Sequence, residues 1–193
     1  MTDTHLVVVS GSRGAGKDSI ATALAVQLHL RRIVAYTTRA PRHGEQDGRE
    51  YHFVSDSEFE KLVRDNRFVW FGQVSPAQRH GVSEDVFKTS SGGSVLVTMP
   101  PAALAIRKRM GATEGGMTFL LAVFASRAER YQRIRKRQPD ISDLAVQRLM
   151  QEDPVSPRIG DFRDFDARIL NSGTNPKPAY QRAIKLVRRF LQR

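Results

Sequence analysis

The stretch Ser10-Gly11-Ser12-Arg13-Gly14-Ala15-Gly16-Lys17-Asp18-Ser19 decides how the chain around it is interpreted. The apolar residues 6–9 before it predict a buried strand, and residues 20–28 after it predict a helix. A strand, a glycine-rich turn, a lysine and a helix follow the pattern G-x-x-x-x-G-K, here Gly11 to Lys17. Such a turn directs backbone N–H groups and the positive end of the helix dipole at a polyphosphate. We therefore expect residues 11–19 to bind phosphate; the alternative is a glycine-rich turn with an incidental lysine.

One position departs from this pattern, which calls for Ser or Thr after the lysine to place a hydroxyl on Mg²⁺. Here Asp18 follows Lys17, and Ser19 comes next. A carboxylate oxygen also suits Mg²⁺, so Asp18 is a candidate metal ligand. The alternative is an acidic residue favoured by the helix dipole in the first turn. The sequence leaves both open.

The composition limits the classes of partner. The chain has 193 residues, 40% of them hydrophobic, which suits one globular domain. The lack of Cys excludes disulfides and thiol chemistry. No apolar run approaches the roughly 18 residues of a membrane span, and the first residues lack a basic leader, so we expect a cytoplasmic protein without membrane contact. No sequence feature predicts an oligomeric state.

The charge balance favours polyanionic partners, because 31 Lys and Arg residues stand against 20 Asp and Glu residues, a net charge of +11. Aromatic residues are not interleaved with the basic residues as in proteins that bind single-stranded nucleic acid. We therefore expect small phosphorylated molecules as partners rather than nucleic acid.

The order of predicted elements indicates an α/β fold. Strands are expected at residues 6–9, 31–36, 51–54, 68–74, 94–98, 117–124 and 167–171, and helices at 20–28, 56–63, 86–88, 102–110, 126–137, 142–153 and 179–191. This alternation predicts a three-layer fold with a mainly parallel sheet. Within a single domain spanning residues 1–193, we expect a core of residues 1–36 and 87–193, with a helical lid at about 133–158. Residues 37–86 are expected to form an inserted, acceptor-binding subdomain over the loop.

A second motif resembles one known family. The segment reads Thr37-Thr38-Arg39-Ala40-Pro41-Arg42-x-Gly44-Glu45-x-x-Gly48-x-x-Tyr51-x-Phe53-Val54-Ser55. It is similar to T-T-R-x-P-R-x-G-E-x-x-G-x-x-Y-x-F-V-S of the guanylate kinase family, and the resemblance covers nearly the whole chain. It implies a P-loop kinase that uses ATP and Mg²⁺ and a small phosphate-bearing acceptor. Arg39, Arg42 and Tyr51 would hold the acceptor phosphate, since guanidinium groups grip phosphate in bidentate fashion. The alternative is structural arginines paired with Glu45 or Asp47.

The resemblance continues in the predicted lid. The family's R-L-x-x-R, with a further arginine eleven residues on, falls at Arg133, Arg137 and Arg148. It implies that these arginines, with Lys17, are catalytic and neutralise the charge of the transferring phosphoryl group. The alternative is a basic, solvated helix. Asn171 matches an asparagine that the family has near the adenine.

The chain departs from the family where guanine is recognised. The family's F-x-E-W reads Phe68-Val69-Trp70-Phe71, its Y-G-S/T reads His80-Gly81-Val82, and its L-D-x-D reads Leu96-Val97-Thr98-Met99. Acids that would accept guanine's N–H donors are missing, which lowers discrimination. Trp70 and His80 would instead narrow the acceptor pocket.

These departures leave three interpretations of the function. A neighbouring branch, the ribose 1,5-bisphosphate phosphokinases of phosphonate catabolism, resembles the chain in G-K-D-S and in Val95-Leu96-Val97, although it lacks so complete a T-T-R signature and carries an N-G-S-R that is absent here. We expect an ATP-dependent phosphotransferase whose favoured acceptor is ribose 1,5-bisphosphate, giving phosphoribosyl diphosphate. GMP is the alternative acceptor. A non-catalytic binding module is the third reading, and Lys17 and the lid arginines argue against it.

Overall fold

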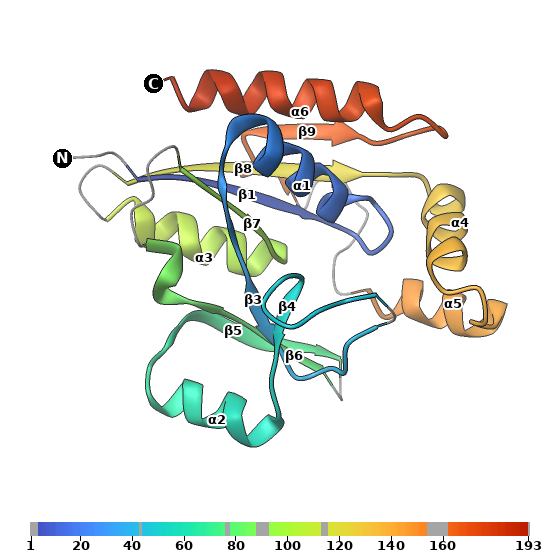
Figure 1. Cartoon of the computed structure of the whole chain (residues 1–193), viewed down its shortest axis with the longest axis horizontal. Coiled ribbons are helices and arrows are strands. Elements are labelled where there is room, and N and C mark those ends of the chain that lie inside the picture. Colours follow the sequence, from blue (N-terminus) through green and yellow to red (C-terminus); the bar gives the residue numbers. More distant parts are fainter. Residues whose placement is uncertain are drawn as a thin grey trace.

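The computed structural model describes residues 4–42, 44–75, 78–87, 93–112, 116–153 and 162–192. Within these residues the central sheet consists of β1 (Thr4–Gly11), β2 (Arg31–Ile33), β7 (Ser94–Val97), β8 (Gly116–Phe124) and β9 (Ala167–Leu170). Its order is β2-β7-β1-β8-β9, and every neighbouring pair is parallel (Figure 1). A second sheet consists of β3 (Ala35–Thr37), β4 (Tyr51–Phe53), β5 (Phe68–Ser75) and β6 (Gln78–Ser83), in the order β4-β3-β6-β5.

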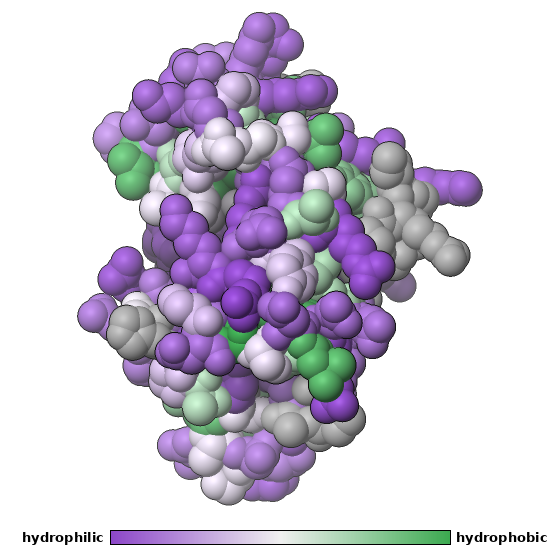
Figure 2. Space-filling model, turned by 90° about the vertical axis from the view of Figure 1, so that its right-hand side faces the viewer, coloured by the Kyte–Doolittle hydropathy of each residue, from purple (hydrophilic) through white to green (hydrophobic). Residues whose placement is uncertain are grey.

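Helices of the described residues pack against both sheets. They are α1 (Lys17–Leu28), α2 (Asp56–Arg64), α3 (Pro100–Met110), α4 (Arg127–Arg137), α5 (Asp143–Gln151) and α6 (Lys177–Phe190), with a short 3-10 helix η1 (Glu84–Phe87). The side on which α4 and α5 lie is largely hydrophilic (Figure 2). In the described part of the chain, no helix is both long and apolar enough to cross a membrane.

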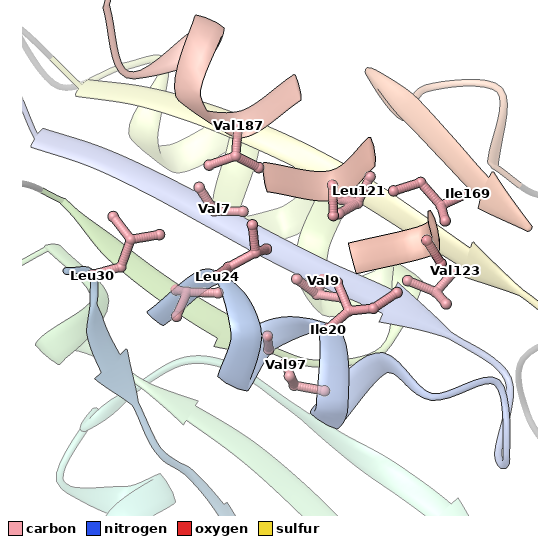
Figure 3. Packing of buried hydrophobic residues seen from close by; sticks show 14 of the residues in the cluster. Val7, Val9, Ile20, Leu24, Leu30, Val97, Leu121, Val123, Ile169 and Val187 are labelled. Carbon is pink, nitrogen blue, oxygen red and sulfur yellow. The ribbon is translucent and has the colours of Figure 1, made fainter. Parts of the chain in front are cut away.

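The pleat of β1 explains why the parallel sheet needs helices on both faces. Val7 and Val9 belong to a buried cluster with residues of α1 and α6, among them Leu24 and Val187 (Figure 3). Leu6 and Val8, which alternate with them, belong to a second cluster with residues of α3. A strand buried on both faces reads as the continuous apolar run seen in the sequence. The predicted three-layer α/β fold is confirmed.

Two strand predictions were wrong. The expected strand at residues 31–36 is divided at Val34, because Ile33 pairs with Leu96 in the central sheet whereas Ala35 pairs with Tyr51 in the second sheet. Strand β6 was missed because its residues are mostly polar and include Gly81. That glycine is required by packing, since a Cβ there would lie 2.6 Å from the ring of Phe68.

Several helix boundaries also differ from the prediction. Helix α3 begins at Pro100 rather than at residue 102, because proline in the first turn lacks an N–H that a helix could not pair there. The short helix expected at residues 86–88 is η1, which begins at Glu84. Residues 154–158, the last part of the expected lid, lie outside the described residues.

Candidate active site

A cavity of about 480 Å³ lies between the glycine-rich loop, the second sheet and α4. Most of the predicted site residues line it: Gly11, Arg13, Gly14, Gly16, Lys17, Asp18, Ser19, Arg39, Arg42, Tyr51, His80, Arg133 and Arg137. The structure therefore brings the predicted phosphate loop, the predicted acceptor residues and two predicted lid arginines to one place. Five predicted residues are not among those that line it: Ser12, Ala15, Trp70, Arg148 and Asn171.

The loop is shaped to present backbone N–H groups. Gly16 precedes α1 with φ of 91°, and no side chain of the described residues caps the helix N-terminus. A Cβ at Gly16 would collide with the side-chain amide of Asn171, so both the conformation and the space require glycine. The uncapped N–H groups of α1 are therefore available to an anion.

Lys17, the first residue of α1, places a cation beside these N–H groups. Burial lowers the pKa of Lys17, while the negative charges of Asp18 and Asp153 act in the opposite direction. A buried ammonium group needs a compensating anion, and a phosphate in the cavity would supply one.

Asp18 lies at the loop side of the cavity, where its side chain is 57% exposed and its Oδ1 is 3.5 Å from Nη2 of Arg32. Ser19 also lines the cavity. The described residues contain no group of three or more side chains that would hold a metal alone. One carboxylate and a neighbouring hydroxyl do fit Mg²⁺, which proteins commonly bind through one or two carboxylates together with substrate phosphates and water.

At the opposite end, Arg39 and Arg42 form a cationic wall arranged by Glu45. Arg39 Nη1 and Nη2 donate to the two carboxylate oxygens of Glu45 at 2.6 and 2.9 Å, and the Arg42 N–H donates to Oε2 at 2.8 Å. Thus the pairing with Glu45 that the sequence left open is present, while both arginines still line the cavity. Burial and the nearby Arg39 lower the pKa of Arg42 to about 10, so it remains protonated at neutral pH.

Tyr51 and His80 continue this wall. The Arg39 guanidinium lies 5.1 Å from the centre of the Tyr51 ring, and the Tyr51 and His80 ring centres are 5.2 Å apart. Burial raises the pKa of Tyr51 to about 12, so its hydroxyl stays protonated. Burial and the charges of Arg39 and Lys17 lower the pKa of His80 to about 3, which keeps the imidazole neutral.

Gln78, which no sequence motif indicated, also lines the cavity, and its Nε2 lies 2.9 Å from Nε2 of His80. Residues two apart on a strand share a face, so recognising β6 would have placed Gln78 beside His80. Asp153 was missed as well, and it lines the loop end. No sequence signal connects Asp153 to a loop 140 residues away.

Several predicted residues occupy other places. Trp70 packs against the cluster around Leu6 and Val8 and does not line the cavity, because its ring lies over Gly72. Arg148 is exposed on α5. Asn171 is buried behind the loop, where its side-chain amide donates to the carbonyl of Ala15 at 2.9 Å.

The two lid arginines of α4 differ in their contacts. Arg133 Nη2 donates to the carbonyl of Asn171 at 2.8 Å, and its Nη1 reaches the carbonyls of Gly14 and Ala15 at 3.4 and 3.3 Å. Arg133 therefore fastens α4 to the back of the loop. The side chain of Arg137 lines the cavity, and it has no hydrogen-bond or ion-pair partner among the described residues. Of the two guanidinium groups, that of Arg137 is therefore the one with no described partner and the one available to bind a phosphate.

The comparisons with known proteins agree with this arrangement. Residues 3–90 match the family model described as guanylate kinase. A guanylate kinase of Rubrobacter xylanophilus is 34% identical over 194 residues, which cover 97% of this chain and 95% of the relative. One of Shewanella denitrificans is 33% identical over 172 residues, covering 86% and 79%.

A crystal structure of guanylate kinase from Anaplasma phagocytophilum has the same fold. It aligns with a TM-score of 0.70 over 100% of this chain and 88% of that one, at 19% identity. A third of the sequence is shared with the Rubrobacter relative along nearly its whole length, and the motifs that match converge on one cavity. The chain therefore belongs to the guanylate kinase family and is a P-loop kinase, an ATP-dependent phosphotransferase.

Proposed function

We propose that the chain transfers the γ-phosphoryl group of ATP to GMP and selects guanine less strictly than a site with carboxylates at the base would. One observation carries this proposal: the loop with Lys17 and the arginines Arg39 and Arg42 line the same cavity. A donor phosphate at one end and an acceptor phosphate at the other would then face each other. The naming of the most similar relatives as guanylate kinases supports GMP as the acceptor.

At the donor end, the loop N–H groups and Lys17 would bind the phosphates of ATP. Asp18 and Ser19 would hold Mg²⁺, which supplies charge neutralisation between the outer phosphates. Arg137, free of described partners, would neutralise the charge that spreads over the transferring group. Arg133, which bonds loop carbonyls, would support the loop rather than meet the phosphate.

At the acceptor end, Arg39, Arg42 and Tyr51 would hold the acceptor phosphate so that one of its oxygens points at the γ-phosphorus. That oxygen forms the new P–O bond while the bond to the bridging oxygen of ADP breaks. Phosphoryl transfer depends mainly on positioning and electrostatics, so a general base is not required. Residues 37–86 would act as the acceptor-binding unit and residues 133–158 as the lid.

The weak selection for guanine follows from the cavity wall. At its acceptor end the described carboxylates are already engaged, Glu45 by the two arginines and Glu50 by the Gln46 N–H at 2.8 Å and by Arg49. Val82, where the family has a hydroxyl, is only 1% exposed. Guanine N–H donors therefore meet neutral groups such as Gln78. The same observation favours ribose 1,5-bisphosphate, which has no base, as a second candidate acceptor.

The products test this proposal. Incubation with ATP, Mg²⁺ and GMP is expected to give ADP and GDP in equal amounts, quantified by chromatography, and Lys17→Ala is expected to form both at least about 100-fold more slowly. ADP without GDP would contradict GMP as acceptor. GMP left unchanged while ribose 1,5-bisphosphate yields phosphoribosyl diphosphate would support the second candidate.

A further inference from the structure

A buried ion pair beside the loop has no part in the function proposed so far. Arg130 lies on α4 and Asp153 lies just beyond the end of α5, and each side chain is 5% exposed. Nη2 of Arg130 is 2.6 Å from Oδ2 of Asp153. Removing two charges from water is costly, so a buried pair persists only where further hydrogen bonds satisfy both groups. The further hydrogen-bond partners of the pair therefore indicate which segment of the chain it fixes in place.

Both members of the pair bond the peptide groups of one loop residue, Arg13. Its N–H donates to Oδ2 of Asp153 at 2.7 Å, and its carbonyl accepts from Nε of Arg130 at 2.7 Å. The next residue, Gly14, is packed directly against α4, since a Cβ there would lie 2.8 Å from the carbonyl oxygen of Arg130. The outer half of the loop is thus fixed by side chains 117 and 140 residues away.

The pair also matters for the charge around the loop. Asp153 lines the cavity together with Arg13 and Lys17. Burial lowers the pKa of Arg13, and the charge of Asp153 opposes this effect. Without Asp153, Arg130 would remain buried without the carboxylate, and the loop cations would lose a nearby anion.

We propose that Arg130 and Asp153 are positioning residues for the donor site, which hold the peptide groups of Arg13 so that the loop is in its binding shape before the donor arrives. This inference rests on the proposed binding of ATP phosphates by the loop. Preorganised groups bind more tightly because they do not have to be ordered when the ligand arrives. Breaking the pair should therefore weaken donor binding and leave the acceptor end, built on β3, β4 and β6, unaffected.

The chain contains a matched control pair, Arg107 and Asp166. Oδ2 of Asp166 accepts from Arg107 Nη2 and from the Leu120 N–H, which repeats the arrangement at Asp153 without touching the loop. Asp166→Ala therefore removes the same two kinds of contact elsewhere in the fold, although the Asp166 side chain is 37% exposed and that of Asp153 is 5% exposed. A purely structural role of Asp153 predicts that its alanine variant, like Asp166→Ala, loses stability while its Kd for ADP does not change.

The test measures ADP affinity by titration calorimetry, the thermal midpoint of unfolding, and the KM for GMP. We expect Asp153→Ala to raise the Kd for ADP about tenfold or more, and Asp153→Asn, which keeps an oxygen for the Arg13 N–H, about threefold. The KM for GMP should stay within about twofold of wild type. Asp166→Ala should lower the thermal midpoint while its Kd for ADP stays within about twofold.

An unchanged Kd in folded Asp153→Ala, tighter ADP binding, or equal loss in Asp153→Ala and Asp166→Ala would overturn the proposal. If the alanine variant does not fold, the nearly isosteric Asp153→Asn decides the question by the same comparison. Wild-type protein that binds ADP but does not phosphorylate GMP would contradict the proposed function alone. Wild-type protein that does not bind ADP would contradict the donor site on which the inference rests.

Discussion

At the residue scale, Lys17 is the side chain on which we expect donor binding to depend most. It is the lysine that the loop pattern places at the outer phosphates, and its burial leaves it in need of an anion. Lys17→Ala is expected to lower kcat about 100-fold or more, because a transition-state contact to charge is lost. Steady-state kinetics with circular dichroism checks this, and Lys61→Ala on α2 serves as the control. Near-normal kcat in a folded Lys17→Ala protein would exclude the loop as the donor site.

Substitutions at Arg39 and Arg42 are expected to weaken acceptor binding without weakening donor binding. Each would make a charge-assisted contact to the acceptor phosphate, worth about 1.5–3 kcal/mol. Arg39→Ala and Arg42→Ala are therefore expected to raise the acceptor KM about ten- to hundredfold, while the KM for ATP stays near wild type. Both KM values are measured by titrating each substrate at a saturating concentration of the other substrate. A parallel rise in both KM values would mean that the substitution disturbs the whole cavity instead.

His80 is expected to make the stability of the folded protein depend on pH. Its pKa of about 3 in the folded protein, against an ordinary value of 6.5, means that the unfolded chain binds the proton more readily. Stability is therefore lost as pH falls from 6.5 towards 3. Between pH 7 and pH 5 the free energy of unfolding should fall about 2 kcal/mol more in wild type than in His80→Gln. Urea unfolding at both pH values measures this, and identical losses would contradict a buried, neutral His80.

Local patterns could predict some site residues and not others. The loop and Arg39, Arg42 and Tyr51 belong to motifs with fixed spacing, and of residues 11–19 with these three all but Ser12 and Ala15 line the cavity. Trp70 was expected to line the cavity, but its ring lies over Gly72, a contact that the sequence pattern does not indicate. Asp153 depends on a contact across 140 residues, which only the folded chain creates.

At the scale of elements, the sequence predicts those with strong periodicity or caps. Helix α2 is an example, because the Ser55 hydroxyl accepts from the Glu58 N–H and the Glu58 carboxylate accepts from the Ser55 N–H. Strand β6 was missed because it is stabilised by pairing with β5 and β3, not by an apolar pattern of its own. The division of residues 31–36 between two sheets likewise depends on distant partners.

The capping box of α2 predicts a stability effect without an effect on catalysis. Ser55→Ala removes the cap and is expected to lower the free energy of unfolding by about 1 kcal/mol. No residue of α2 lines the cavity, so kcat/KM should remain within about twofold of wild type. Chemical denaturation and steady-state assays of the same preparation check both parts. Loss of activity without loss of stability would mean that α2 takes part in acceptor binding.

At the scale of the whole molecule, the parallel sheet and the second sheet each supply one end of a single cavity. The loop follows β1, Arg39 and Arg42 follow β3, and Tyr51 begins β4, so the fold would set the proposed donor and acceptor against each other. The alternation of elements predicts this architecture, whereas the identity of the acceptor depends on side chains that vary without changing the fold.

The choice of acceptor is decided by kcat/KM for GMP, AMP and ribose 1,5-bisphosphate with ATP, on one preparation of wild-type protein. We expect GMP to be phosphorylated with the highest kcat/KM and AMP to follow within about 100-fold, because the described carboxylates at the acceptor end of the cavity are already engaged and do not recognise guanine. This expectation fails under either of two results. A value for ribose 1,5-bisphosphate above that for GMP, or no GDP at all, would contradict it.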